Sequence, residues 1–172
     1  GITNVKSEIK KRPQDELWNY QQLDLGFNYR RNDIQATIGL SQMNRLDKYV
    51  TRRHEIAEYY DDEFKNLPIT IPWQSPKVFS SYHLYSIRIK NNQNNITQQQ
   101  VYNELKQNNI SVNLHYIPVH RHPYYENLGF KKNDFPVAEK FHQETISIPI
   151  FPLLTNIQQE HVAKTLKNIF IK

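Results

Sequence analysis

The sequence contains no cysteine among its 172 residues. Disulfide bonds, thiolate nucleophiles and thiolate metal ligands are therefore excluded, which is typical of a cytoplasmic protein. Only four glycines are present, namely Gly1, Gly26, Gly39 and Gly129. Because no two of them have the spacing of a phosphate-binding loop or a dinucleotide fingerprint, nucleotide-binding loops of those types are absent.

Long apolar runs are also missing, and no stretch approaches the ~20 residues of a membrane-spanning helix. We therefore expect no membrane partner and a cytoplasmic location. The formal net charge of +5 is a feature of many nucleic-acid-binding proteins. However, the basic residues are scattered among acidic ones, and Lys10-Lys11-Arg12 is the only run of three. This pattern favours an ordinary solvated surface, so we expect no nucleic-acid partner.

Hydrophobic periodicity predicts one long helix from residue 33 to about residue 66, which Pro68 ends. Asn32 and Gln35 have the spacing of a capping box at its start. Because such a helix would be about 50 Å long, we expect it either to connect two domains or to break near residues 49–51. The polar segment before it is expected to be extended and to pack on something else.

Alternating apolar residues predict three strands, and Ser/Thr-x-x-Gln patterns predict two helix starts. The strands are expected at residues 82–89, 110–116 and 145–150. Two helices are expected to begin at the capping pairs Thr97 with Gln100 and Thr155 with Gln158. A third, short helix is expected at residues 136–144, after Asp134. This order predicts a small sheet with helices packed on one face. The domain organisation we expect is an extended segment 1–32, a connecting helix 33–67 and a small α/β (α+β) domain 68–172.

Three histidines, His115, His120 and His122, lie close together in sequence. We expect no metal site there, because zinc requires three or four ligands and neither a cysteine nor a nearby carboxylate completes the set. A polar loop after a strand and the edge of a substrate pocket both remain open interpretations. His83 shares the apolar face of its predicted strand with Tyr85, so we expect a half-buried, hydrogen-bonded histidine.

Residues 26–36 place a polar cluster at the start of the long predicted helix. Asn28 and Arg30 can both donate hydrogen bonds to an anion, and a helix N-terminus beside an arginine is suited to phosphate. However, surface helices often begin after Asn or Asp for purely structural reasons. From these residues alone, a phosphate site and a simple helix cap both remain open.

The segment 26–36 resembles the G-x-N-Y-R-x-x-D-x-Q-A-A motif of the DegT/StrS family of sugar aminotransferases, which use pyridoxal phosphate. A second block, residues 115–130, contains His-Tyr-Ile-Pro-Val-His and Leu-Gly-Phe and resembles a second family motif. A third block, residues 134–155, contains Asp-Phe-Pro-Val-Ala-Glu and Ser-Ile-Pro-Ile-Phe-Pro. The three blocks occur in family order and extend over most of the chain.

The resemblance implies the C-terminal domain of the aspartate-aminotransferase-like fold, with a connecting helix and a three-stranded sheet covered by helices. It also implies a homodimer that binds pyridoxal phosphate. Asn28 would reach the cofactor phosphate of the partner subunit, and Arg30 would stabilise that region or the substrate diphosphate.

The second block borders the sugar-nucleotide site in the family. The resemblance therefore implies substrate contacts from His115, Tyr116, His120 and Tyr124. At His122 relatives commonly carry glutamine, so the polar contact expected there differs.

The third block most resembles enzymes of the pseudaminic-acid type. The reaction this implies moves an amino group from glutamate to C4 of a UDP-linked 4-keto-6-deoxy sugar, for cell-surface polysaccharide or glycan biosynthesis. The Schiff-base lysine and the carboxylate that holds the cofactor nitrogen are expected upstream, and residues 1–3 resemble the end of the turn after that lysine. We therefore expect a fragment, inactive alone, produced by design, proteolysis or gene splitting.

Two other classes of function remain open. One is a stand-alone module that binds sugar or nucleic acid through exposed aromatic and basic side chains. The other is a structural dimerisation piece in which Ile34, Ile38 and Leu40 pack on a partner.

Overall fold

A computed structural model describes residues 2–3, 7, 21–27, 29, 31–90 and 95–171 of the chain. The chain divides into two compact units, residues 1–44 and 45–172, and each is described by itself. Within the described residues no helix combines the length and the apolar character needed to cross a bilayer.

The first unit contains a short strand pair and one helix. Strand β1 (Ile2–Thr3) pairs antiparallel with β2 (Gln21–Gln22), and α1 spans Asp33–Met43. The capping box predicted for this helix is confirmed. The Asn32 side chain accepts a hydrogen bond from the Gln35 N–H at 2.9 Å, and the Gln35 side chain accepts one from the Asn32 N–H at 3.2 Å.

The long helical stretch is interrupted, which was one of the two expectations for it, but the position suggested for the break was wrong. Helix α1 ends at Met43, and α2 begins afresh at Leu46 and continues to Phe64. The interruption falls at Asn44, a poor helix former because its short polar side chain competes for backbone hydrogen bonds. Residues 49–51 stay helical, and the first two of them are already partly buried, so packing supports the helix there.

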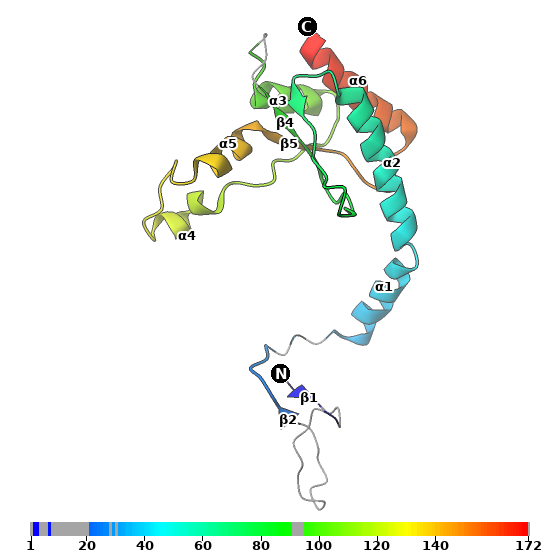
Figure 1. Cartoon of the computed structure of the whole chain (residues 1–172), viewed down its shortest axis with the longest axis vertical. Coiled ribbons are helices and arrows are strands. Elements are labelled where there is room, and N and C mark those ends of the chain that lie inside the picture. Colours follow the sequence, from blue (N-terminus) through cyan, green and yellow to red (C-terminus); the bar gives the residue numbers. More distant parts are fainter. Residues whose placement is uncertain are drawn as a thin grey trace, which may run out of the picture. The chain divides into compact units, whose positions relative to one another are not determined.

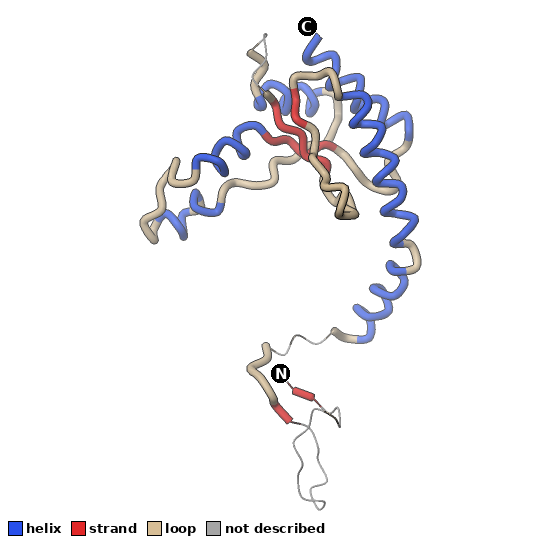
Figure 2. The backbone as a smooth tube through the Cα atoms, viewed as in Figure 1, coloured by secondary structure: helices blue, strands red, loops and turns tan. Residues whose placement is uncertain are grey.

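The second unit is built on a three-stranded antiparallel sheet in the order β3-β4-β5 (Figure 2). The strands span Ile69–Thr70, Tyr85–Ile89 and Thr145–Ile148. In the central pair, Tyr85 lies opposite Ile148, Ser86 opposite Ser147, Ile87 opposite Ile146 and Arg88 opposite Thr145.

One face of this sheet packs into the apolar core with helices α2, α3 (Gln98–Gln107) and α6 (Asn156–Ile171). Helices α2 and α6 contact one another along this core (Figure 1). Full burial of a Leu or Ile side chain contributes about 1.5–3 kcal/mol, so this cluster is the main source of stability. The fully buried side chains with the largest volumes are Tyr60, Tyr85, Phe64, Ile56, Ile87, Leu105, Ile146, Leu166 and Val101.

Both helix starts predicted from Ser/Thr-x-x-Gln patterns are confirmed. The Thr97 hydroxyl accepts the Gln100 N–H at 3.3 Å, and the Gln100 side chain accepts the Thr97 N–H at 2.8 Å. Thr155 and Gln158 repeat this exchange at the start of α6, at 3.2 and 3.0 Å. Each reciprocal pair satisfies helix N–H groups that lack a partner inside the helix.

The segment 110–116, predicted as a strand, does not pair along its length with another strand of the sheet. It meets β5 only through an isolated bridge between Asn113 and Ser147. Neighbouring backbone N–H groups form local hydrogen bonds instead of bonds to a strand. The Ile110 N–H donates to the Leu105 carbonyl, and the Leu114 N–H donates to the Asn113 side chain. The alternation itself persists, since Ile110 and Val112 are buried in the core. The strand that completes the sheet is β3 instead.

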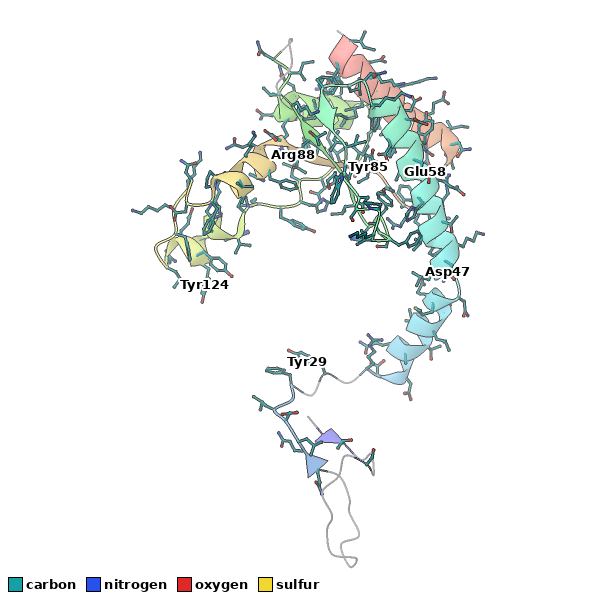
Figure 3. All side chains as sticks on the ribbon, in the orientation of Figure 1. Tyr29, Asp47, Glu58, Tyr85, Arg88 and Tyr124 are labelled. Atoms are coloured by element: carbon teal, nitrogen blue, oxygen red, sulfur yellow. The ribbon has the colours of Figure 1, made fainter. Side chains whose placement is uncertain are left out.

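The opposite face of the sheet is polar, and helix α5 (Pro136–Glu144) meets it. Arg88 projects from this face and forms an ion pair with Glu144 at 2.6 Å, while its guanidinium lies 5.9 Å from the centre of the Phe141 ring. Figure 3 shows Arg88 and Tyr85 on the same strand. The prediction of helices on one face only was therefore wrong, although the bounds predicted for α5 are confirmed.

The expectation of a half-buried His83 was also wrong, since the residue is exposed. Tyr82 has a positive φ of 44°, which interrupts the extended backbone before β4 begins at Tyr85. Arg53 of α2 fixes this bend, because its Nη1 donates to the carbonyl oxygens of Tyr82 at 2.8 Å and of Ile150 at 3.0 Å. One partly buried cation thus ties the entrance of β4 to the segment after β5.

Replacing Thr145 with valine should stabilise the protein. The Thr145 Oγ1 atom is buried in β5 and has no hydrogen-bond partner among the described residues. A buried polar group without a partner costs about 1–3 kcal/mol, and valine has the same shape without the hydroxyl. We expect Thr145→Val to raise the free energy of unfolding by about 1 kcal/mol in urea denaturation.

The matched control is Thr155→Val, which removes the cap of α6 and should lower the free energy of unfolding by about 1 kcal/mol. A loss of stability in the Thr145 variant would show that its hydroxyl has a partner after all.

Candidate functional site

An arm projects from the second unit between the bridge at Asn113 and strand β5. It contains a 3-10 turn (Val119–Arg121), the short helix α4 (Pro123–Glu126) and α5 (Figure 1). Both helices begin with a proline, whose fixed φ suits the first helical position and whose missing N–H is not needed there.

A buried, hydrogen-bonded pair of side chains holds the arm together. His120 Nε2 lies 2.9 Å from Glu139 Oε1, and these residues are only 6% and 3% exposed. The other carboxylate oxygen, Oε2, accepts a hydrogen bond from Arg121 Nη1 at 3.3 Å. The pair joins the 3-10 turn to α5 across 19 positions of sequence. Phe135 packs against the His120 ring with 4.9 Å between ring centres.

The Glu139 carboxyl is stabilised in its ionised form. Burial opposes ionisation, but the hydrogen bonds from His120 and from the backbone of Asn133, together with the charge of Arg121, outweigh it. Together they hold the pKa of Glu139 below its ordinary value of 4.5.

A groove of about 650 Å³ lies beside this pair, between the loop after Asn113 and helix α5. This volume is in the range of small-molecule sites, about 300–1,000 Å³. Its polar side chains are those of His115, Tyr116 and Asp134, and none of its lining residues is a lysine or arginine. The apolar lining consists of Pro118, Phe135, Pro136, Val137, Ala138 and Phe141.

His115 and Tyr116, both predicted to contact substrate, therefore line one groove. The Tyr116 side chain is 72% exposed, and its ring meets that of His115 edge-on with 4.7 Å between centres. His115 Nδ1 lies 2.9 Å from the Ser147 hydroxyl of β5, and its Nε2 lies 3.3 Å from Asn113 Nδ2.

The other two predicted substrate residues lie outside the groove lining. His120 lies behind Phe135, with its Nε2 engaged by Glu139. Tyr124 is 69% exposed on α4, far along the arm from Tyr85 and Arg88 (Figure 3).

Asn28 and Arg30, the predicted cofactor contacts, lie outside the described residues. Between them, Tyr29 is exposed and its ring stacks on Phe27 with 5.8 Å between centres. The described part of this segment thus presents aromatic side chains at the surface immediately before α1.

The histidine cluster has a carboxylate beside it that the sequence did not reveal, because Glu139 lies against His120. His122 is exposed. Across the described ranges no group of three or more His, Cys, Asp or Glu residues is placed to hold a metal ion.

Residues Glu139 and Ser147 escaped prediction. Glu139 is the one buried residue of α5, whereas the apolar Val137 and Phe141 of the same helix are exposed. This arrangement inverts the usual amphipathic pattern, so hydrophobic periodicity gives no sign that Glu139 is buried. The only usable signal was a glutamate within the third family block.

A family model described as the DegT/DnrJ/EryC1/StrS aminotransferase family matches residues 5–167 of the chain. The chain belongs to this family. The family's aminotransferases depend on pyridoxal phosphate, so the resemblance found in the three sequence blocks is confirmed at this level.

Curated relatives agree with the family. The chain is 36% identical over 93% of its length to the uncharacterized protein MJ1066 of Methanocaldococcus jannaschii, and 32% identical over 88% to the spore coat polysaccharide biosynthesis protein SpsC of Bacillus subtilis. It is 31% identical over 95% to the UDP-4-amino-4,6-dideoxy-N-acetyl-beta-L-altrosamine transaminase of Campylobacter jejuni. The chain spans only 42%, 40% and 42% of these three relatives.

Solved structures share the fold. Spr1654 of Streptococcus pneumoniae, assigned as a sugar aminotransferase, superposes with a TM-score of 0.79 at 27% identity, over 92% of this chain and 40% of that one. Spr1654 is also known in forms with pyridoxal phosphate and pyridoxamine phosphate. PseC of Helicobacter pylori, an aminotransferase involved in the biosynthesis of pseudoaminic acid, gives 0.75 at 26% identity, over 98% of this chain and 44% of that one.

The substitution Glu139→Gln should make stability less dependent on acid pH. Because the pKa of Glu139 is depressed in the folded state, its contribution is complete above about 4.5 and is lost as the pH falls through the lower folded value. The wild type should therefore lose more stability than the variant between pH 6 and the acid range, as measured by thermal unfolding at each pH.

Glu126→Gln is the control, because this glutamate is exposed on α4. Its pH profile should match that of the wild type. Parallel profiles for wild type and Glu139→Gln would contradict the stabilising role assigned to the ionised Glu139 carboxylate.

Proposed function

We propose that this chain forms the C-terminal part of a pyridoxal-phosphate-dependent aminotransferase acting on a nucleotide-linked sugar. The reaction converts the C4 carbonyl of a UDP-linked 4-keto-6-deoxy sugar to an amine, while glutamate becomes 2-oxoglutarate. The product would serve cell-surface polysaccharide or glycan biosynthesis. Membership of the family carries this proposal, and the Campylobacter jejuni and Helicobacter pylori relatives support the choice of sugar.

The groove beside α5 suits the sugar end of such a substrate. Aromatic and apolar walls from Phe135 and Phe141 can pack on the faces of a sugar ring, and the Tyr116 hydroxyl can bond its oxygens. The diphosphate does not suit this groove, because its charged lining residue is Asp134, a carboxylate. Phosphate contacts would therefore come from residues outside the groove.

The donors suited to a phosphate are Asn28 and Arg30, which stand before α1. An amide and a guanidinium donate hydrogen bonds to anions, whereas the first turn of α1 carries Asp33, whose charge opposes one. We therefore assign the contact with the cofactor phosphate to Asn28, with Arg30 beside it. Pyridoxal phosphate, when bound, carries the amino group between glutamate and the sugar and withdraws electrons.

The exposed apolar side chains of helix α1 support a homodimer, in which a partner subunit and further protein surface would cover them. Ile34 and Ile38 lie about 40° apart around its axis, but Leu40 lies about 120° from Ile34 and Met43 about 180° from it. All four side chains are exposed in the first unit. Apolar side chains thus project from more than one side of α1, with polar residues such as Gln35 and Thr37 between them, and exposed apolar surface of this kind is typical of a protein-protein contact. Sedimentation of the assembled enzyme as a monomer would contradict the dimer.

A chimera tests the proposed function directly. This chain replaces the corresponding C-terminal part of the Campylobacter jejuni transaminase, to which it aligns over 166 residues. We expect the chimera to form 2-oxoglutarate from glutamate with a UDP-linked 4-keto sugar, and more slowly with a GDP-linked one. We expect the chain alone to form none, since the Schiff-base lysine would come from the remaining part of the enzyme.

Two outcomes would overturn this proposal. One is transamination by the chain alone. The other is a folded chimera that binds pyridoxal phosphate but aminates no 4-keto nucleotide sugar, while the parent enzyme remains active in the same assay.

Substituting Asn28 tests the cofactor contact. In the chimera, Asn28→Ala should weaken retention of pyridoxal phosphate by roughly ten- to a hundredfold, the value of one hydrogen bond to a charged group. The absorbance of bound cofactor during dialysis measures it. Asn32→Ala is the matched control, because it removes the cap of α1 and should lower helix stability instead. Equal cofactor loss in both variants would mean that Asn28 only supports the helix.

A further inference from the structure

We propose that Ser147 and Ser86 are positioning residues that fix the ring of His115 in the wall of the groove. The functional part of this inference rests on the proposed binding of the sugar in that groove. The structural part rests on hydrogen bonds between three segments that are far apart in sequence.

The two serines form a polar bridge across the sheet. Ser147 of β5 lies directly opposite Ser86 of β4, with 2.8 Å between their Oγ atoms. Ser147 is 5% exposed, and its Oγ also lies 2.9 Å from His115 Nδ1. The backbones of Ser147 and Asn113 exchange two further hydrogen bonds, at 2.9 and 3.2 Å, which hold the loop of His115 against the strand.

The hydrogen-bond pattern selects one tautomer of His115. The Asn113 Oδ1 atom accepts the Leu114 N–H at 2.8 Å, which turns the amide so that Nδ2 faces His115 Nε2 at 3.3 Å. An amide nitrogen only donates, so His115 Nε2 accepts. Nδ1 therefore carries the hydrogen and donates it to Ser147 Oγ, which also shares a hydrogen bond with the Ser86 hydroxyl. Hydrogen bonds thus connect the side chains of Asn113, His115, Ser147 and Ser86 in that order.

This arrangement changes what His115 offers to a ligand. Both ring nitrogens are hydrogen-bonded within the protein, so the His115 ring presents carbon atoms to the groove. Its contribution to binding is then van der Waals contact rather than hydrogen bonding. The Tyr116 ring rests edge-on against it, so the orientation of His115 also sets that of the exposed Tyr116 hydroxyl. Hydrogen bonds to sugar oxygens would then come from Tyr116.

Packing alone does not account for a serine at position 147. The residue is buried in the middle of a strand, where Ile146 and Ile148 flank it. Serine has no particular preference for strands, and a buried hydroxyl is costly unless it is bonded. Its neighbour on the same face, Thr145, shows the alternative of a buried hydroxyl with no partner.

The experiment compares Ser147→Ala with Thr145→Val, a control that removes a buried hydroxyl from the same strand and face. Nitrogen-15 NMR of the histidine ring in this chain reports the tautomer of His115. We expect the wild type and Thr145→Val to show the Nδ1–H form, and Ser147→Ala to show a mixture with Nε2–H. In the chimera, Ser147→Ala should raise the KM for the sugar roughly two- to tenfold and leave kcat nearly unchanged.

Ser86→Ala provides a second variant if Ser147→Ala does not fold, and it should shift the tautomer in the same direction by less. An unchanged tautomer in the folded serine variants would overturn the proposal, as would a changed tautomer with an unchanged KM. If the chimera aminates no sugar at all, the NMR result still decides the role of Ser147, so the two proposals fail separately.

Discussion

The pairing register of β4 with β5 is the constraint on which the second unit depends. It places Tyr85 and Ile87 on one face, in the apolar core, and Ser86 and Arg88 on the other. Because strand side chains alternate with a period of two, a slip of one residue would turn the serines and the arginine into the core. The same register that buries the core therefore creates the polar face on which His115 and α5 are organised.

The core was largely predictable from sequence, because its elements have clear local signals. Capping pairs such as Thr97 with Gln100 act over three residues, and the periodic apolar face of α2 is visible in any window of the sequence. The errors arose where local backbone bonding competes with the pattern. Residues 110–116 alternate like a strand, but the Asn113 side chain and the end of α3 take the donors that a ladder needs.

The candidate site was predictable only in part, for a different reason. Family motifs drew attention to His115 and Tyr116, and both line the groove. The groups that hold the site together are Glu139 and Ser147, which lie 18 and 32 positions away from Arg121 and His115, respectively. A partner at such a distance leaves no trace in local periodicity, and a buried glutamate on a short helix runs against the amphipathic rule. Only the folded chain reveals these contacts.

The apolar surface of α1 has a consequence for the life of the protein in the cell. In a copy that is not bound to a partner, the side chains of Ile34, Leu40 and Met43 are exposed to water. Exposed apolar side chains on a folded chain are the surface that chaperones retain and that leads to aggregation. In the proposed homodimer, abundance of the chain would therefore follow the supply of its partner, and surplus copies would be removed by quality control.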